Sequence, residues 1–150
     1  MKTSFKILFP FVIYVISSFT AYAQTGRFYT TDGGLSSSLI NHFFQDSKGF
    51  MWTATEYGLN SFDGLRFANY WHVSGDSTSI KNNYVRTLFE DSWQNLLIGC
   101  IDGLMRYDRE TNTFSEIPMI RAGKQVFPHV TQMQELHNGE IWMTTTGQGM

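Results

Sequence analysis

Hydrophobic side chains recur along this chain at a fixed spacing of 45 residues. Trp52, Leu97 and Trp142 occupy one column of the repeat. Other columns agree with it: Ile40, Val85 and Val130; Phe43, Leu88 and Met133; and Met51, Leu96 and Ile141. Self-similarity at this period, with several short strand-like runs in each unit, is typical of a β-propeller. One such unit cannot bury both faces of its sheet alone, so the repeat predicts an assembly of stacked sheets.

The first unit contains four strand-like runs that are separated by turn residues. The runs cover 39–46, 50–55, 59–63 and 66–72. Ile40 and Phe43 are three residues apart, which breaks strict alternation and places the start of the first strand near Asn41. Asp46 to Gly49 and Asp63-Gly64 are turn signals, because Asp accepts hydrogen bonds from the following backbone and Gly tolerates positive φ.

The later units repeat this pattern. Strands are expected over 84–91, 96–100, 104–108 and 113–117, and then over 130–136 and 141–145. We therefore predict an all-β fold of four-stranded antiparallel propeller blades, with about 2.5–3 blades present of a larger ring. Blade 1 spans 39–83, blade 2 spans 84–128, and a partial blade 3 spans 129–150. The repeat signature consists of Trp52, Gly58, Leu59, Asp63, Leu97, Gly103, Leu104, Asp108, Trp142 and Gly149.

The Trp column is expected to belong to the core, since its phase follows the packing pattern. Small residues, Ala54 and Gly99, follow it by two positions, as the narrow inner part of a blade requires. Propellers close with about four to eight blades. The chain is therefore expected to be a fragment of a longer product, since an isolated set of three blades would leave two open sheet edges. Assembly with copies of itself is the weaker alternative.

The N-terminus has the pattern of a secretory signal peptide. Lys2 and Lys6 precede the apolar run 7–16, and Ala21-Tyr22-Ala23 supplies small residues before a cleavage point. Residues 1–23 are thus expected to be removed during export, and a retained membrane anchor is the alternative. Segment 24–38 is expected to form an N-terminal strand, centred on 27–29, that could complete the last blade of the ring. The alternative for this segment is a frayed tail.

Charge and cysteine content exclude several classes of function. The formal net charge is −2, and without Lys2 and Lys6 it becomes −4, from 9 basic and 13 acidic residues. No basic stripe is present, so nucleic acid is not an expected partner. The single cysteine, Cys100, rules out an internal disulfide and is expected to be a small buried side chain.

No catalytic, metal or cofactor site is expected within this segment. His42, His72, His129 and His137 are scattered without metal-ligand spacing. The adjacent carboxylates Glu90 and Asp91 are a candidate pair for acid–base chemistry. Asp91 shares a turn column with Asp46, however, which favours a structural role.

Recognition is expected on one face of the ring. The connections around 72–83 and 118–129 are long and differ from each other, whereas the turns 46–49, 91–94 and 137–140 are short. Variable loops on a rigid scaffold usually carry binding. The candidate ligand-binding residues on this face are Glu56, Tyr57, Lys81, Asp102, Arg121 and Lys124. The alternative is that each of them is a solvated loop residue.

Several segments carry a family resemblance. Gly-Leu-Ser at 34–36, the run 44–52 (FQDSKGFMW), the run 57–64 (YGLNSFDG), and the matching runs 89–92 and 102–108 together resemble the two-component regulator propeller repeat. The strand that starts at Trp52 departs from the family's usual Trp-Ile-Gly-Thr, reading Trp-Thr-Ala-Thr, and its counterparts read Leu-Ile-Gly-Cys and Trp-Met-Thr-Thr. Such swaps conserve volume well enough for a packed core.

The resemblance implies a periplasmic sensor of a hybrid two-component system, with two seven-bladed propellers, a β-sandwich, an inner-membrane helix and a histidine kinase region. It also implies an oligosaccharide ligand, a homodimeric full-length protein and control of genes for polysaccharide use. Alternatives from other classes are a secreted propeller glycosidase and a carbohydrate-binding or scaffold protein without kinase output.

Overall fold

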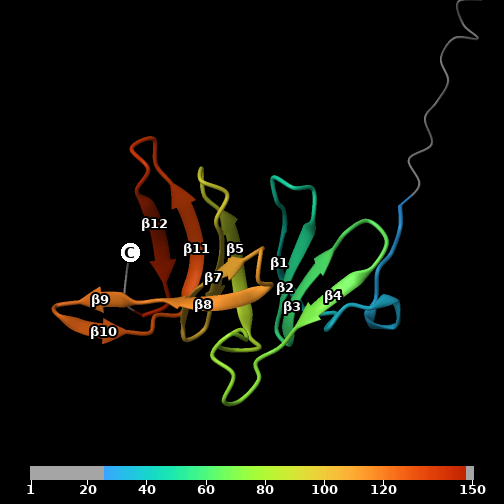
Figure 1. Ribbon diagram of the computed structural model, residues 1–150, viewed down its shortest axis with the longest axis horizontal. Helices are drawn as coiled ribbons and strands as arrows, with labels where there is room; N and C mark the ends of the chain where they lie inside the picture. The colour runs from blue at the N-terminus through green and yellow to red at the C-terminus, as the bar shows by residue number, and fades with distance from the viewer. Residues whose placement is uncertain (1–25, 148–150) are drawn as a thin grey trace, which may run out of the picture.

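The computed structural model describes residues 26–147, which form four antiparallel sheets. Three of them lie side by side and correspond to the repeats, and the fourth is a two-stranded hairpin (Figure 1). The expected signal peptide, 1–23, and the signature residue Gly149 lie outside the described residues. Within the described part the only helical element is a 3₁₀ turn, η1 (Thr31–Gly33). The predicted all-β fold of four-stranded antiparallel sheets is confirmed.

Each complete sheet follows the chain order of its strands. The first consists of β1 (Ile40–Gln45), β2 (Met51–Thr55), β3 (Gly58–Phe62) and β4 (Phe67–Tyr70). The second consists of β5 (Val85–Glu90), β6 (Leu96–Cys100), β7 (Gly103–Asp108) and β8 (Thr113–Ile117). The third contains β11 (Val130–Glu135) and β12 (Ile141–Thr145). These bounds lie close to the strands expected from the sequence.

A β-bulge recurs at the start of each inner strand. The register shifts between Ile40 and His42 in β1, and the same shift occurs at the equivalent positions of β5 and β11. The bulge explains the irregular spacing of Ile40 and Phe43, because an extra residue moves the following side chains to the other face of the strand.

The connection between the second and third sheets is more ordered than expected. Instead of an irregular loop over 118–129, it contains a hairpin of β9 (Met119–Arg121) and β10 (Lys124–Val126). The turn uses two residues with positive φ, Ala122 at 50° and Gly123 at 75°. The sequence offered no strong signal here because Ala rarely adopts this conformation.

The expected strand over 24–38 is not formed in the described part of that segment, 26–38. Instead the segment lies against the first sheet. The Ser36 N–H donates to Asn60 Oδ1 at 2.7 Å, and Asn69 Nδ2 donates to the Gly34 carbonyl at 3.0 Å. Leu35 is buried, as is Ile80 one repeat later. The segment is thus held by side-chain hydrogen bonds rather than by a strand edge, and ring closure stays a prediction.

The core lies between neighbouring sheets, in two clusters. One fills the space between the first and second sheets and includes Trp52, Leu88 and Phe114. The other joins the second and third sheets and includes Leu97, Leu104 and Met133. Trp52 stacks on Tyr70 at 5.8 Å between ring centroids and meets Tyr107 edge-on at 4.9 Å.

The Trp column is buried at two of its three positions. Trp52 is 2% exposed and Leu97 is 4% exposed, as predicted for core residues. Trp142 is 47% exposed, so the prediction that it is buried is wrong for the described structure. The physical reason is that β12 ends the third sheet in the described part, and no further sheet covers that side of it.

Small residues of the repeat allow close approach of the backbone. A Cβ at Gly99 would lie 2.6 Å from Thr87 Cγ2 and 3.1 Å from Val130. The signature residue Gly58 has a φ of 119°, and a Cβ there would lie 2.9 Å from the Tyr70 carbonyl. Gly99 is therefore required by space, and Gly58 is required by both space and backbone conformation.

Replacing Trp52 tests the core assignment. Trp52→Ala in the complete ectodomain should lower the free energy of unfolding by about 3–5 kcal/mol, because it removes the indole from between two sheets. Chemical denaturation measures the change. Leu65→Ala is the control, since Leu65 is 88% exposed and its loss should be nearly neutral. Equal effects of the two substitutions would contradict the assignment.

Candidate functional site

The strand order gives the sheets two distinct rims. The short-turn face carries the turns between the first and second strands and between the third and fourth strands of each sheet. The long-loop face carries the turns between the second and third strands, together with the connections between sheets. In Figure 1 the turns β1–β2, β5–β6 and β11–β12 lie at the top, and the connection after β4 lies at the bottom.

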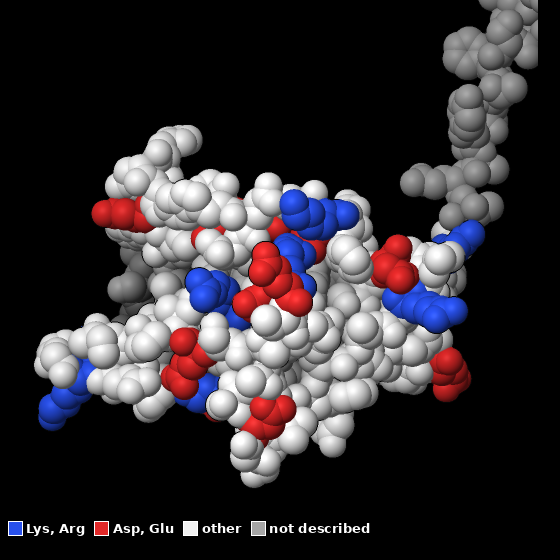
Figure 2. All heavy atoms as spheres, in the orientation of Figure 1, with Lys and Arg blue, Asp and Glu red and all other residues white. Residues whose placement is uncertain are grey.

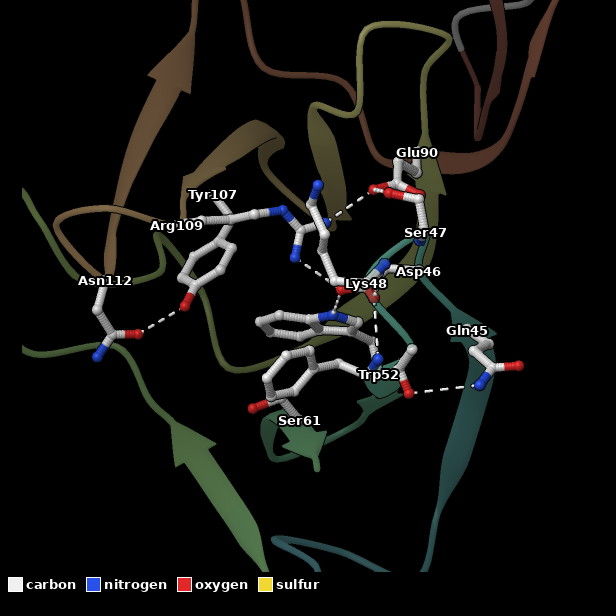
Figure 3. Close-up of polar contacts among 12 residues, drawn as sticks. Gln45, Asp46, Ser47, Lys48, Trp52, Ser61, Glu90, Tyr107, Arg109 and Asn112 are labelled. Atoms are coloured by element: carbon white, nitrogen blue, oxygen red, sulfur yellow. Dashed lines mark hydrogen bonds and ion pairs between the residues drawn. The ribbon is translucent and has the colours of Figure 1, made fainter. Parts of the chain in front are cut away.

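Asp46 organises the short-turn face of the first sheet. Its Oδ1 accepts hydrogen bonds from the N–H groups of Lys48 and Phe50, both at 2.9 Å. Its Oδ2 accepts from Trp52 Nε1 at 2.7 Å and from Arg109 Nη1 at 2.7 Å. The carboxylate therefore closes the β1–β2 turn and orients the buried indole at the same time (Figure 3).

Arg109 links the first two sheets. It comes from the β7–β8 turn of the second sheet, and Figure 3 shows its guanidinium between Asp46 and Glu90. Its Nη2 donates to Glu90 Oε1 at 2.8 Å. Glu90 also accepts from the Ser47 N–H at 2.7 Å and from Ser47 Oγ at 3.0 Å. We refer to Asp46, Ser47, Glu90 and Arg109 as the inter-sheet clip.

The serine–glutamate contact of the inter-sheet clip recurs between the second and third sheets. Ser92 donates its N–H and its Oγ–H to Glu135, both at 2.7 Å. Leu97 has no indole, and Asn95 Nδ2 donates to Asp91 Oδ2 at 2.7 Å in its place. Asp91 thus closes its own turn while Glu90 faces the first sheet, which supports the structural interpretation of this carboxylate pair.

Local environment shifts several pKa values. Burial alone would raise the pKa of Asp46, but hydrogen bonds from Arg109, Trp52 and Phe50 outweigh it and hold that pKa below its usual value. Burial raises the pKa of the Cys100 thiol to about 12, so the thiol stays neutral and poorly reactive at pH 7. Burial also raises the pKa of Tyr107, whose hydroxyl donates to Asn112 at 2.7 Å.

Three of the ligand-binding candidates already form hydrogen bonds or ion pairs with other side chains. Glu56 accepts a hydrogen bond from the Tyr84 hydroxyl at 3.1 Å, and Asp102 accepts one from Asn82 at 3.2 Å. Lys81 pairs with Glu116 at 2.7 Å and lies 3.9 Å above the ring of Phe127. Their polar groups therefore help to fix the long loops.

The other three candidates lie apart from these. Tyr57 is 64% exposed at the β2–β3 turn. Arg121 and Lys124 face each other in the β9–β10 hairpin. Lys81 lines a hollow of about 340 Å³ near Ile80, whereas Arg121 lines a separate hollow of about 520 Å³ near Met143. The structure does not bring the six candidates into one described pocket.

A polar hollow of about 420 Å³ lies along the inner strands β1, β5 and β11. Arg86 donates to Asn41 at 3.4 Å across the first two sheets. His42 Nδ1 accepts from the Leu88 N–H at 3.1 Å, and burial lowers the pKa of His42, which favours the neutral ring that this bond needs. Asn41 and Arg86 share a column of the 45-residue repeat, and this signal could have revealed them from the sequence.

Charged side chains do not form a single-sign surface on the face drawn in Figure 2, where Lys and Arg lie beside Asp and Glu. Within the described residues, no three His, Cys, Asp or Glu side chains gather closely enough to hold a metal ion. Among residues 26–147, no helix is both long and apolar enough to cross a membrane.

Residues 34–57, which include Asp46 and Trp52, match the two-component regulator propeller. The match covers part of the first 45-residue repeat. The Asp46–Trp52 hydrogen bond explains why Asp and Trp occur together in the matched residues: the turn carboxylate pairs with the buried indole.

The chain is similar to a histidine kinase and to extracellular domains of hybrid two-component systems. The chain is 35% identical over 77 residues to histidine kinase P4 of Formosa agariphila. The matched region covers 49% of this chain and 6% of that protein. The extracellular domain of a hybrid two-component system of B. thetaiotaomicron is 30% identical, with a TM-score of 0.69, over 79% of this chain and 17% of that one. A second such domain from the same organism is 26% identical, with a TM-score of 0.66, over 82% of this chain and 18% of that one. The chain thus spans about a sixth of these solved domains.

The clip predicts a pH-dependent contribution to stability. Arg109→Met should lower the free energy of unfolding by about 1–3 kcal/mol at pH 7, because Asp46 and Glu90 each lose a charged donor. A carboxyl with a lowered folded pKa stabilises the fold above its ordinary pKa of 3.8, and the contribution disappears as pH falls through the folded value. The difference between the wild-type protein and the variant should therefore shrink below about pH 4.

Denaturation of both proteins between pH 3 and pH 7 measures this difference. Arg106→Met is the matched control, because it removes the same charge from an exposed position of β7. A difference that stays constant across the whole pH range would contradict the role assigned to Asp46.

Proposed function

We propose that this chain is part of the periplasmic sensor region of a two-component histidine kinase of the hybrid type. The observation that carries the proposal is the joint match of repeat sequence and blade geometry to extracellular domains of hybrid two-component systems. The similarity to a protein named as a histidine kinase supports a kinase region elsewhere in the full-length product. In this proposal the full-length protein is exported, anchored in the inner membrane and homodimeric.

The proposed partners of this segment include the remaining propeller blades of the full-length protein. Phe43 is 68% exposed on β1, although its repeat counterpart Leu88 is 2% exposed. Ile40 is 49% exposed, whereas Val85 is fully buried. This apolar side of the first sheet supports closure by another blade, since large exposed apolar side chains are stabilised by a covering sheet.

The proposed ligand is an oligosaccharide released from a polysaccharide, and the proposed output is transcription of genes for polysaccharide use. A ligand can signal only if it binds two states of the sensor with different affinity. The inter-sheet clips support such a mechanism, because they couple the sheets through a few charged contacts on one rim. A ligand that bridges two blades would favour one packing of these contacts over another.

The alternative of a propeller glycosidase lacks support in the described residues. A glycosidase needs a general acid with a raised pKa beside a second carboxylate. Asp46 has a lowered pKa, and its two oxygens accept hydrogen bonds from the β1–β2 turn, Trp52 and Arg109. Its arrangement is that of a structural carboxylate.

Calorimetry on the complete ectodomain tests the sensor proposal. At least one oligosaccharide from a panel of neutral, uronate-containing and sulfated members should bind with a micromolar or tighter dissociation constant, equivalent to about −8 kcal/mol. The same oligosaccharide should change the autophosphorylation rate of the full-length protein in membranes, and a noncognate oligosaccharide is the control. A folded ectodomain that binds no member would refute the ligand class, and binding without any change in autophosphorylation would refute the sensor output.

A further inference from the structure

A hollow of about 650 Å³ lies on the short-turn face between the second and third sheets. It is distinct from the long-loop candidates named from the sequence. Its lining includes Phe89, Ser92, Trp93, Gln134, His137 and Asn138. The feature that sets it apart is an exposed tryptophan at its wall.

Trp93 is held in place although its side chain is 68% exposed. Its backbone N–H donates to Asp91 Oδ1 at 3.0 Å, which fixes the turn that carries it. Its six-membered ring rests on the opposite turn, since a Cβ at Gly139 would lie 3.3 Å from Trp93 Cη2. The indole therefore keeps a defined position and presents apolar surface to solvent, an arrangement typical of interaction sites.

Comparison of the three repeats shows that the fold does not require this indole. Lys48 and Asn138 occupy the equivalent position in the other two sheets. The next residue has positive φ in all three turns, and it is Gly49 at 90°, Gln94 at 66° and Gly139 at 83°. A non-glycine residue in this conformation costs about 1 kcal/mol. Trp93-Gln94 thus costs more backbone free energy than a glycine turn would, although the equivalent turns of the other two sheets form without an indole.

The lining of the hollow indicates the charge of its ligand. Glu135 is the one carboxylate that lines it, and both of its oxygens accept from Ser92 at 2.7 Å. No Lys or Arg is among the described lining residues. The other polar groups of the lining are two amides and an imidazole. Gln134 Nε2 already donates to the Glu135 carbonyl at 3.0 Å and Asn138 Oδ1 already accepts from the Glu140 N–H at 3.1 Å, so the amide groups offered to a ligand are Gln134 Oε1 and Asn138 Nδ2. Such a surface does not compensate the charge of a sulfate or a uronate, so it suits an uncharged polar ligand.

We propose that this hollow binds a neutral hexopyranose unit of an oligosaccharide, with Trp93 as the stacking platform. The C–H face of a pyranose packs on a flat aromatic ring, and its hydroxyls match the amide groups of Gln134 and Asn138 and the ring of His137. The inference rests on the proposed function for its ligand class, and it adds the binding face, the central residue and the charge of the sugar. Because the hollow lies between two sheets, an occupant would contact both of them.

The test compares Trp93→Ala with Lys48→Ala in the complete ectodomain. Lys48 is the matched control, because it occupies the same turn position in the first sheet and lies outside the hollow. The probes are purified neutral gluco-, manno- and galacto-oligosaccharides of three to six units, with uronate-containing and sulfated oligosaccharides alongside. Calorimetry gives the dissociation constants, and denaturation confirms that both variants are folded.

We expect a neutral oligosaccharide to bind, Trp93→Ala to weaken it by about tenfold or more, and Lys48→Ala to change it less than about twofold. Trp93→Phe should retain part of the affinity, because it keeps an aromatic face. If the ectodomain binds a neutral oligosaccharide but Trp93→Ala has no effect, the inference is wrong and the proposed function stands. If only charged oligosaccharides bind, the inference is equally wrong. If no oligosaccharide binds, both fail.

A second readout concerns the exposure of the indole. Acrylamide should quench the fluorescence of Trp93 in the complete ectodomain, measured as the difference between the wild-type protein and Trp93→Phe, and the bound neutral oligosaccharide should protect it. An indole that acrylamide cannot reach in the ligand-free ectodomain would show that another part of the protein or a second copy occupies the hollow, which overturns the inference.

Discussion

The burial of each sheet by its neighbour is the constraint on which the rest of this structure depends. Phe43, Leu88 and Met133 occupy one column of the repeat, but only the latter two have a sheet against them. Leu88 and Met133 are buried, and Phe43 is exposed. A large apolar side chain in the same strand position therefore gains or loses its hydrophobic stabilisation according to whether a further sheet is present.

Polar contacts on the short-turn face add direction to this apolar packing. Hydrophobic burial alone allows neighbouring sheets to slide or rotate, because it has no preferred geometry. The inter-sheet clip favours one relative position of the first two sheets, since Ser47 and Arg109 both donate directional hydrogen bonds to Glu90. Ser92 and Glu135 repeat the contact between the second and third sheets. The charged groups are partly or fully buried, which makes their geometry matter more than that of a surface pair.

The two rims of the sheets have consequently taken different roles. On the long-loop face, Glu56, Lys81 and Asp102 bond to neighbouring loop residues and stabilise the connections. On the short-turn face, the turns are short and tightly hydrogen-bonded, yet one of them holds Trp93 in the open. Rigid turns suit recognition well, because a side chain that is already fixed loses little entropy when a ligand binds. A binding function on this rim is thus compatible with its role in joining the sheets.

The sequence by itself determined the fold class, the strand bounds and the small residues of the blades, because each depends on local backbone preference or on a side chain's phase in the repeat. Trp52, Ala54 and Gly58 are examples, and each has the role that its column predicted. The tertiary structure alone decided which repeated residues are covered, as the exposure of Trp142 shows, since burial depends on a neighbour that no local pattern records. It also decided the partners of Asp46, because Arg109 lies 63 residues away and only the packing of two sheets brings their charges together.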